Sequence, residues 1–522
     1  MSAALPKLLS SKQRSRRART NIASVLISCY ICIWILTGFV ATSDQFLHWF
    51  VVPVLFCGIL IGIDAVDWLR GRLDIFDPIG VLGALGFHLF FLAPLLHVHW
   101  DYWMRYVIPP PDWRGWLGGM AFLNLLGLLA YRAFRGGSIG NALKQPRKMV
   151  WRLDRQRFFI IMSGALLVTG LLQLWVYARF GGILGYMQAA TDLENPDAMR
   201  GMGWIFMISE SFPILALMAF AVYTGRKEFY KSWSVIVLLL LVYFILKMLF
   251  GGLRGSRSNT IWGLFWAVGI IHFWLRPISK KLIFIGCIFM VVFMYFYGFF
   301  KDSGVKGLKV LDSARARAEL TEQTGRSFDS TLLGDLGRSD VQAFVLYRIL
   351  RPESDYEYAW GRTYFGALAL LIPRSIWPDR PPTKVKEGTE VQYGREGNDA
   401  TYKRGPYTPG IWETSRVYGL AGETMLNFGP VPVPFAFLIF GLVVRSIRRL
   451  MMTLGPTDSR LMLLPFLANL CFVILASDSD NILFFLIKNG AVPFVVLALA
   501  SIKQVVTNTD IWCSTHEPYR HG

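Results

Sequence analysis

Long apolar runs, separated by short polar stretches, dominate this chain. Each run holds roughly 17 to 25 residues, which is enough for a helix to cross about 30 Å of hydrocarbon. On this basis we predict twelve membrane-spanning helices. Their expected ranges are 22–42, 47–65, 78–98, 115–134, 158–178, 204–224, 234–252, 259–275, 282–300, 428–447, 461–477 and 482–502.

These runs divide the chain into five parts. We expect a basic leader at 1–21, nine spans in 22–300, a large polar segment at 301–427, three spans in 428–502 and a tail at 503–522. The first apolar run, 22–40, is longer than a typical signal-peptide core, and no A-x-A-like cleavage site follows it. We therefore expect it to remain as a span.

The Lys and Arg residues predict the orientation, because short cytoplasmic loops carry an excess of them. They gather in the leader and in the even-numbered loops, at 70–72, 135–157, 226–231, 280–281 and 445–460. All of these lie on one side if the N-terminus is cytoplasmic, and twelve spans then return the C-terminus to the same side. We expect a multi-pass membrane protein with both termini in the cytoplasm.

Composition supports the membrane assignment. Hydrophobic residues make up 54% of the chain and charged residues 17%, with a mean hydropathy of +0.42; soluble domains carry about 25% charged residues. The net charge of +19 follows the topology, so we do not expect nucleic-acid binding. None of the six cysteines has the spacing of a metal site, so we expect neither a zinc site nor a disulfide framework.

The segment 301–427 stands on the opposite, extracytoplasmic side and is nearly neutral, with 18 Lys or Arg against 17 Asp or Glu. Its first half, 309–350, has a helix-forming composition. The apolar stretch 363–372 spans only about 15 Å as a helix, which predicts a re-entrant or interfacial helix ended by Pro373. The stretch 378–409 is rich in Pro, Gly and charge and predicts an irregular loop.

Three motifs on the extracytoplasmic side could carry chemistry. The first holds Arg254 and Arg257, whose i, i+3 spacing on a helix suits two phosphates, just before the N-terminus of a span. The alternative is anchoring to lipid headgroups. The second holds Arg374 and Trp377, as a binding element or as an anchored turn. The third holds Glu423, as a general base toward a sugar hydroxyl or as an ion-pair partner of an arginine.

Some charged residues lie inside or at the ends of spans. Glu210 and Lys247 lie within predicted spans and mark either a cavity or a mutual ion pair. Asp478 and Asp480 lie at the outer end of a span. His97 and His99 would point in different directions on a helix, which argues against a metal site.

The three motifs, in this order, resemble the bacterial oligosaccharide repeat-unit polymerases, the O-antigen polymerase (Wzy-type) family. The matching residues are Arg254-Gly255-x-Arg257, then Gly361-Arg362-Thr363-Tyr364 leading into Ile372-Pro373-Arg374-x-x-Trp377-Pro378-x-x-Pro381, then Gly422-Glu423 with Asn427-Phe428-Gly429. The likeness covers roughly 235–450. Arg380 stands where the family pattern has Lys, which keeps the charge.

The resemblance implies an all-α polytopic enzyme of about 12 spans, GT-C-like, with the large loop over its outer face. It implies polymerisation of undecaprenyl-pyrophosphate-linked oligosaccharide repeat units into O-antigen, capsule or exopolysaccharide at the outer face of the inner membrane. Donor and acceptor would both be such lipids, with no metal, cofactor or nucleic acid. A chain-length regulator and a flippase are further candidate partners, beside the bilayer itself.

Under this resemblance the motif residues take roles. Arg254, Arg257 and Arg374, with Arg338 as a weaker candidate, would bind the pyrophosphate and stabilise its charge as it leaves. Glu423 would take the proton from the acceptor hydroxyl. Trp377, Tyr364 and Arg380 would contact sugar. The alternatives are a ligase-like or other lipid-linked glycosyltransferase, and, from another class, a flippase or secondary transporter.

Overall fold

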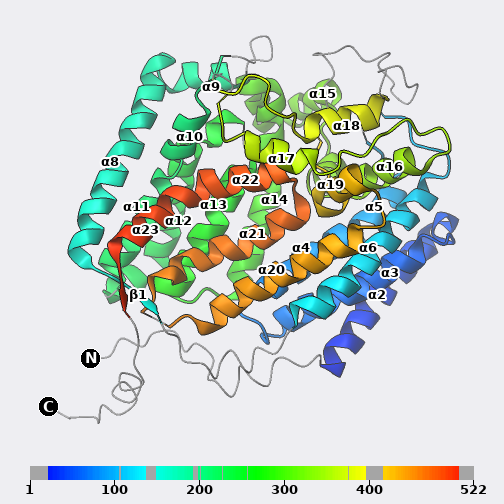
Figure 1. The fold of residues 1–522 in the computed structure, drawn as a ribbon, viewed down its shortest axis with the longest axis horizontal. Coiled ribbons are helices and arrows are strands. Elements are labelled where there is room, and N and C mark those ends of the chain that lie inside the picture. The colour runs from blue at the N-terminus through cyan, green and yellow to red at the C-terminus, as the bar shows by residue number, and fades with distance from the viewer. Residues whose placement is uncertain are drawn as a thin grey trace.

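The computed structural model describes residues 21–104, 107–136, 149–191, 198–199, 201–225, 227–255, 257–373, 376–394, 416–455 and 457–504. Helices make up nearly all of their regular structure (Figure 1). A helix forms at each of the twelve predicted segments. Within the described ranges, 10 helices are long and apolar enough to cross a membrane. The prediction of an all-α, multi-pass chain is confirmed at that level.

The first group of helices comes from the N-terminal part of the chain. It contains α2 (Ile22–Thr42), α3 (Val51–Leu69), α4 (Pro78–Phe87), α5 (Ala93–His99) and α6 (Trp113–Arg135). A π-helical turn, His88–Leu92, joins α4 to α5 into one long rod. Asn21 and Asp77 cap α2 and α4, because each side chain accepts a hydrogen bond from a main-chain N–H of the first turn.

The second group forms the other side of the molecule. It contains α8 (Arg155–Arg179), α9 (Ile183–Thr191), α10 (Gly203–Ser209), α11 (Phe212–Thr224), α12 (Trp233–Leu249), α13 (Arg257–Ile270) with its π-helical end η6 (Ile271–Leu275), and α14 (Lys280–Ser303). The predicted sixth span is two helices, since the chain breaks at Glu210 and Ser211 between α10 and α11.

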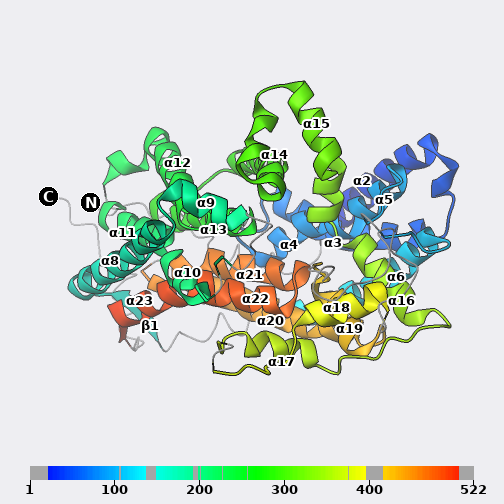
Figure 2. The ribbon, with the colours of Figure 1, turned by 90° about the horizontal axis from the view of Figure 1, so that it is seen from above.

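The C-terminal helices lie between the two groups and join them (Figures 1 and 2). They are α20 (Val433–Thr453), α21 (Leu464–Ala476), α22 (Ser479–Phe485), the π-helical η10 (Leu486–Ala491) and α23 (Val492–Ala500). Helix α20 contacts α6, α21 contacts both α4 and α13, and α23 contacts α8. Residues on α21 and α22 can therefore reach motifs from both halves of the chain.

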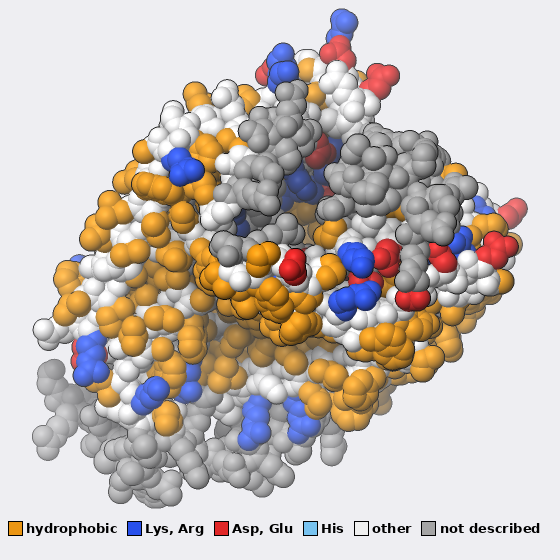
Figure 3. All heavy atoms as spheres, turned by 45° about the horizontal axis from the view of Figure 1, so that its top comes forward, with side chains coloured by type: hydrophobic (Ala, Val, Ile, Leu, Met, Phe, Trp, Pro, Cys, Tyr) orange, Lys and Arg blue, Asp and Glu red, His pale blue; other side chains and the backbone are white. Residues whose placement is uncertain are grey.

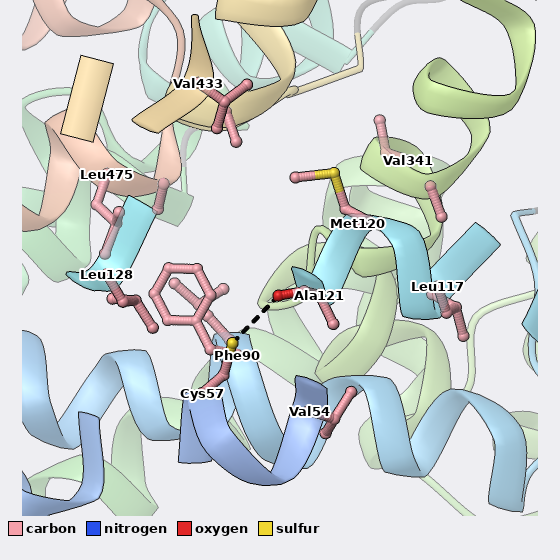
Figure 4. Close-up of a cluster of buried hydrophobic side chains, with 14 of the residues drawn as sticks. Val54, Cys57, Phe90, Leu117, Met120, Ala121, Leu128, Val341, Val433 and Leu475 are labelled. Carbon is pink, nitrogen blue, oxygen red and sulfur yellow. Dashed lines mark hydrogen bonds between the residues drawn. The ribbon is translucent and has the colours of Figure 1, made fainter. Parts of the chain in front are cut away.

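Apolar packing holds the first group together. Figure 4 shows Cys57, Phe90, Met120 and Leu128 converging, and the Cys57 thiol contacts the carbonyl oxygen of Ala121 at 3.3 Å. Helices α3 and α4 approach closely at Gly83, where a Cβ atom would lie 2.5 Å from the main-chain nitrogen of Ala65. A larger residue at Gly83 would force the two helices apart.

Three of the basic loops predicted to share one side, at 70–72, 226–231 and 280–281, have hydrogen bonds to one another's flanking residues. Lys280 donates to the carbonyl oxygen of Leu69 at 3.0 Å, and Arg276 donates to that of Lys231 at 3.1 Å. The structure also contains a short antiparallel sheet, which the sequence did not predict. Its strands are β1 (Val150–Leu153) and β2 (Ser501–Gln504), with Val150 opposite Gln504.

The segment 301–427 is largely helical where it is described. Its elements are η7 (Gly304–Leu311), α15 (Ala314–Thr324), the π-helical η8 (Ser330–Asp335), α16 (Ser339–Leu350), α17 (Arg362–Ala369), α18 (Lys384–Tyr393) and α19 (Gly419–Phe428). The prediction of helices in 309–350 is confirmed. The prediction of an irregular loop over 378–409 is wrong at α18, where Thr383 caps a helix whose inner face is buried.

Large apolar side chains cover the flanks of the molecule, visible as the broad orange surface in Figure 3. Helices α2, α8, α12 and α14 present many of them, for example Trp34, Leu167, Leu238 and Phe284. A soluble monomer rarely exposes a contiguous apolar patch larger than a few hundred Å². This surface suits contact with lipid.

Candidate functional site

Arg254 lies in a buried charged cluster at the junction of α10, α12 and α13. Its Nη2 donates to Oε1 of Glu210 at 2.6 Å, and its guanidinium stacks over the ring of Phe206 at 4.0 Å. Lys488 of η10 contacts the other carboxylate oxygen of Glu210 at 2.7 Å. The amide of Asn259 donates to that same oxygen. A positive φ of 124° at Gly251 turns the chain so that Arg254 reaches inward.

Lys247 belongs to the same cluster but does not pair with the carboxylate. Its ammonium group donates to the main-chain oxygen of Glu210 at 3.3 Å. The sequence left open whether these two residues form a mutual ion pair or mark a cavity. The carboxylate of Glu210 instead forms ion pairs with Arg254 and Lys488. Lys488 lies in the apolar run 482–502, and a charge at such a position is a signal that our sequence interpretation did not use.

Arg257, at the first residue of α13, pairs with a carboxylate from the large loop. Both of its Nη atoms donate to Asp335, with the Nη2 bond to Oδ1 at 2.7 Å. Arg326 contacts Oδ2 of Asp335 at 2.7 Å and Oδ2 of Asp302 at 2.5 Å. Burial acts to raise the pKa of Asp335, but the hydrogen bonds and charges of Arg257 and Arg326 outweigh it and lower that pKa.

Arg338 lies beside this pair and contacts main-chain oxygens. It donates to the carbonyl oxygen of Asp335 at 3.0 Å, to that of Gly337, and to that of Ala476 at 3.2 Å. Burial lowers its pKa, opposed by the negative charges of Asp478 and Asp335. Arg338 thereby links the Arg257–Asp335 pair to the end of α21.

Glu423, on α19, is 3% exposed and ties three helices together. Its carboxylate accepts from the main-chain N–H of Ser479 at 2.7 Å and from the Ser479 hydroxyl at 2.5 Å, both on α22. The hydroxyl of Thr363 on α17 donates to it at 2.8 Å. Among the described residues no arginine contacts this carboxylate, so the interpretation of Glu423 as an arginine's partner finds no support there.

The protonation of Glu423 is tuned by its surroundings. Burial raises its pKa to about 7, and the negative charge of Asp478 adds to that rise. Asp478 is fully buried and pairs with Lys384 of α18. Asp478 also accepts from the main-chain N–H groups of Tyr418 and Gly419, each at 2.8 Å. Near neutral pH, Glu423 can therefore hold or release a proton, as an acid–base group must.

The remaining predicted residues lie near α17. Tyr364 stacks on Phe428 with ring centroids 6.3 Å apart, and Trp377 meets Phe365 edge-on at 6.2 Å. Arg380 donates to the carbonyl oxygen of Ile372 at 2.9 Å. Arg374 lies outside the described residues.

The structure connects two of the three motifs into one polar band. Asp335 bridges Arg257 and Arg338, and Arg338 reaches Ala476, which is three residues before Ser479, the partner of Glu423. Three residues of extended chain span at most about 11 Å. Figure 3 shows a few Lys and Arg side chains inside a hollow of the surface.

An apolar cavity adjoins the Arg254 cluster. It has a volume of about 240 Å³. Two residues of its wall are chain neighbours of the cluster: Met248 directly follows Lys247, and Leu253 directly precedes Arg254. The hydroxyl of Tyr297, also in the wall, donates to the carbonyl oxygen of Gly252. The site thus combines cationic groups with a space suited to hydrocarbon.

No group of His, Cys, Asp and Glu residues arranged to hold a metal occurs within the described ranges. Cys57 and Cys471 are buried in the apolar core, within helices α3 and α21. Comparisons with protein-family models, with curated proteins and with solved structures found no match to this chain.

Proposed function

We propose that this protein is a membrane glycosyltransferase that polymerises oligosaccharide repeat units linked to undecaprenyl pyrophosphate, at the outer face of a bacterial inner membrane. The observation that carries the proposal is the single polar band in which Arg257, Asp335, Arg338 and the Ser479–Glu423 pair follow one another. The motif resemblance is a second support.

The proposed topology has twelve spans, with the two helices α13 and α20 added to the ten that are long and apolar enough by themselves. The contacts among three of the basic loops support a cytoplasmic side there, with both termini on it. The opposite end then carries 301–427 on the outer face. Helix α17, which contacts α22, would serve as the interfacial or re-entrant helix of a GT-C-like arrangement.

In the proposed reaction, a hydroxyl of the acceptor repeat unit attacks the anomeric carbon of the donor glycan. The bond from that carbon to the pyrophosphate breaks, a glycosidic bond forms, and undecaprenyl pyrophosphate leaves. Negative charge grows on the leaving group, and Arg254, Arg257, Arg374 and Arg338 stabilise it. Arginine suits this role because its planar guanidinium binds phosphate through two parallel hydrogen bonds.

The acceptor proton needs a route to Glu423, whose carboxylate is buried. Ser479 is half-buried, and its hydroxyl already donates to Glu423 at 2.5 Å. In the proposed step the Ser479 oxygen takes the proton from the acceptor hydroxyl and passes its own proton to Glu423. Glu423 is the general base, and its pKa of about 7 suits that task.

The test is reconstitution of the purified chain with a synthetic repeat unit on undecaprenyl pyrophosphate. The proposal predicts a ladder of polymer lengths on the lipid carrier, lost in Arg254→Ala and Arg257→Ala without loss of protein abundance. A lipid A core offered in the same vesicles separates the ligase-like alternative, which would load the glycan onto that core. Wild-type ladders retained in both variants would refute the assigned roles.

A further inference from the structure

The cluster around Glu210 holds more positive than negative charge. Among the described residues, Glu210 is its one carboxylate, whereas Arg254, Lys488 and Lys247 are cations. Glu210 is 2% exposed and Lys247 is 3% exposed, so water screens neither well. Within the described part of the chain, the ammonium group of Lys247 makes one hydrogen bond, to the main-chain oxygen of Glu210.

This excess lies at membrane depth. Lys488 is nine residues after Ser479 on a continuous helical segment, which places it about 14 Å below the start of α22. Uncompensated charge in such a place costs free energy and is characteristic of a functional site. An anion bound at Lys247 would remove the imbalance.

The apolar cavity beside the cluster indicates what carries the anion. Met248 and Leu253 face the cavity while their chain neighbours Lys247 and Arg254 face Glu210. Phe300 and Tyr297 complete the wall on the α14 side. A ligand with a phosphate head and a hydrocarbon chain would place its head on the cations and its chain in this space.

Resting on the proposed function, we propose that Lys247, Lys488 and Arg254 bind the phosphate head of a prenyl-chain lipid, and that Glu210 competes with that head for Arg254. Without ligand, Arg254 pairs with Glu210. When the phosphate binds, Arg254 turns to it, and Lys488 and Asn259 still neutralise and solvate the Glu210 carboxylate. Glu210 then lowers the affinity for the lipid and eases its release.

The test measures equilibrium binding of geranylgeranyl pyrophosphate to the full chain in nanodiscs. Lys247→Met removes one charged contact and should weaken binding about tenfold, as a charge-assisted hydrogen bond predicts. Glu210→Gln removes the competitor and should tighten binding. Lys231→Met, at the opposite end of the bundle and paired with the exposed Glu228, is the matched control. Unchanged affinity in Lys247→Met, or weaker binding in Glu210→Gln, would overturn the proposal.

Inorganic pyrophosphate separates a lipid from a free phosphate. We expect it to bind more weakly than the prenyl compound, and Leu253→Ser to weaken only the prenyl compound. Equal affinity for both compounds would overturn the assignment of a lipid. Binding is measured without polymer formation, so the two proposals fail separately. A wild-type chain that binds as described but makes no polymer refutes only the polymerase function, and polymerisation with unchanged binding in Lys247→Met refutes only this inference.

Discussion

Arg257 holds Asp335 through two hydrogen bonds, and Arg326 contacts the same carboxylate. The motif arginine at the start of α13 is thus positioned by the large loop that follows α14. A carboxylate with two arginine partners also keeps one of them when the other is removed. The fold can therefore tolerate loss of Arg257 while the proposed reaction cannot.

Arg257→Ala should lose about 10²- to 10³-fold in polymerisation rate, which is the usual cost of removing one donor to a developing negative charge. Protein abundance and the thermal transition should stay close to wild type, because Arg326 still neutralises Asp335. Arg257→Lys keeps the charge and loses the bidentate geometry, so its polymerisation rate should lie between those of the wild type and Arg257→Ala. Rates from single-turnover assays on vesicles check this order.

Asp335 should contribute to stability in a pH-dependent way. Its pKa is lowered in the folded protein, so its contribution is present above the unfolded pKa of about 3.9 and is lost as pH falls through the lower, folded value. We expect the midpoint of thermal unfolding to fall as the pH is reduced below about 4, and Asp335→Asn to flatten that part of the profile. An equally steep acid limb in Asp335→Asn would contradict the assignment.

The contribution of Glu423 to stability should depend on pH in the opposite direction to that of Asp335. Its folded pKa of about 7 lies above the ordinary value of about 4.3, so ionising it costs stability as pH rises through that window. Polymerisation should increase over the same window, since the base is then deprotonated. Glu423→Gln resembles the protonated acid and should keep the fold, lose the stability slope and lose about 10²- to 10⁴-fold in rate. A variant with wild-type rate would exclude Glu423 as the base.

Ser479→Ala tests the relay to Glu423 separately. The main-chain N–H of Ser479 still donates to the Glu423 carboxylate, so the helix contact remains. The rate should fall while binding of the lipid pyrophosphate does not change. Ser479→Thr, which restores a hydroxyl, should recover part of the rate. A fall in binding equal to the fall in rate would indicate a role in binding the substrate.

Lys384 pairs with the fully buried Asp478, which lies next to Ser479. Lys384→Met leaves that carboxylate without its cation and should destabilise the protein by about 3–5 kcal/mol, the usual cost of removing one partner of a buried pair. The double variant Lys384→Met with Asp478→Asn should recover part of this loss. Thermal unfolding in detergent checks both, and full additivity of the two changes would show that the residues are not coupled.

Hydropathy predicts the helices of this fold well, because a span must be apolar over a fixed length. The sequence did not predict the partners of the site residues. Asp335 and Lys384 are ordinary charged residues of a polar segment, and only tertiary packing brings them to Arg257 and Asp478. Lys488 was not predicted either, although a charge inside an apolar run is itself a signal that could have identified it. Helix α18 was missed because the Pro and Gly residues around it favoured a loop, and the helix N-cap at Thr383 was not recognised.

Release of free undecaprenyl pyrophosphate is the most direct measure of the proposed chemistry. The purified chain, sealed in vesicles with the lipid-linked repeat unit, should release one molecule of this lipid for each glycosidic bond formed, and Arg257→Ala should stop both together. Movement of the intact lipid-linked unit across the bilayer, with no pyrophosphate lipid released, would contradict the account and indicate a transporter.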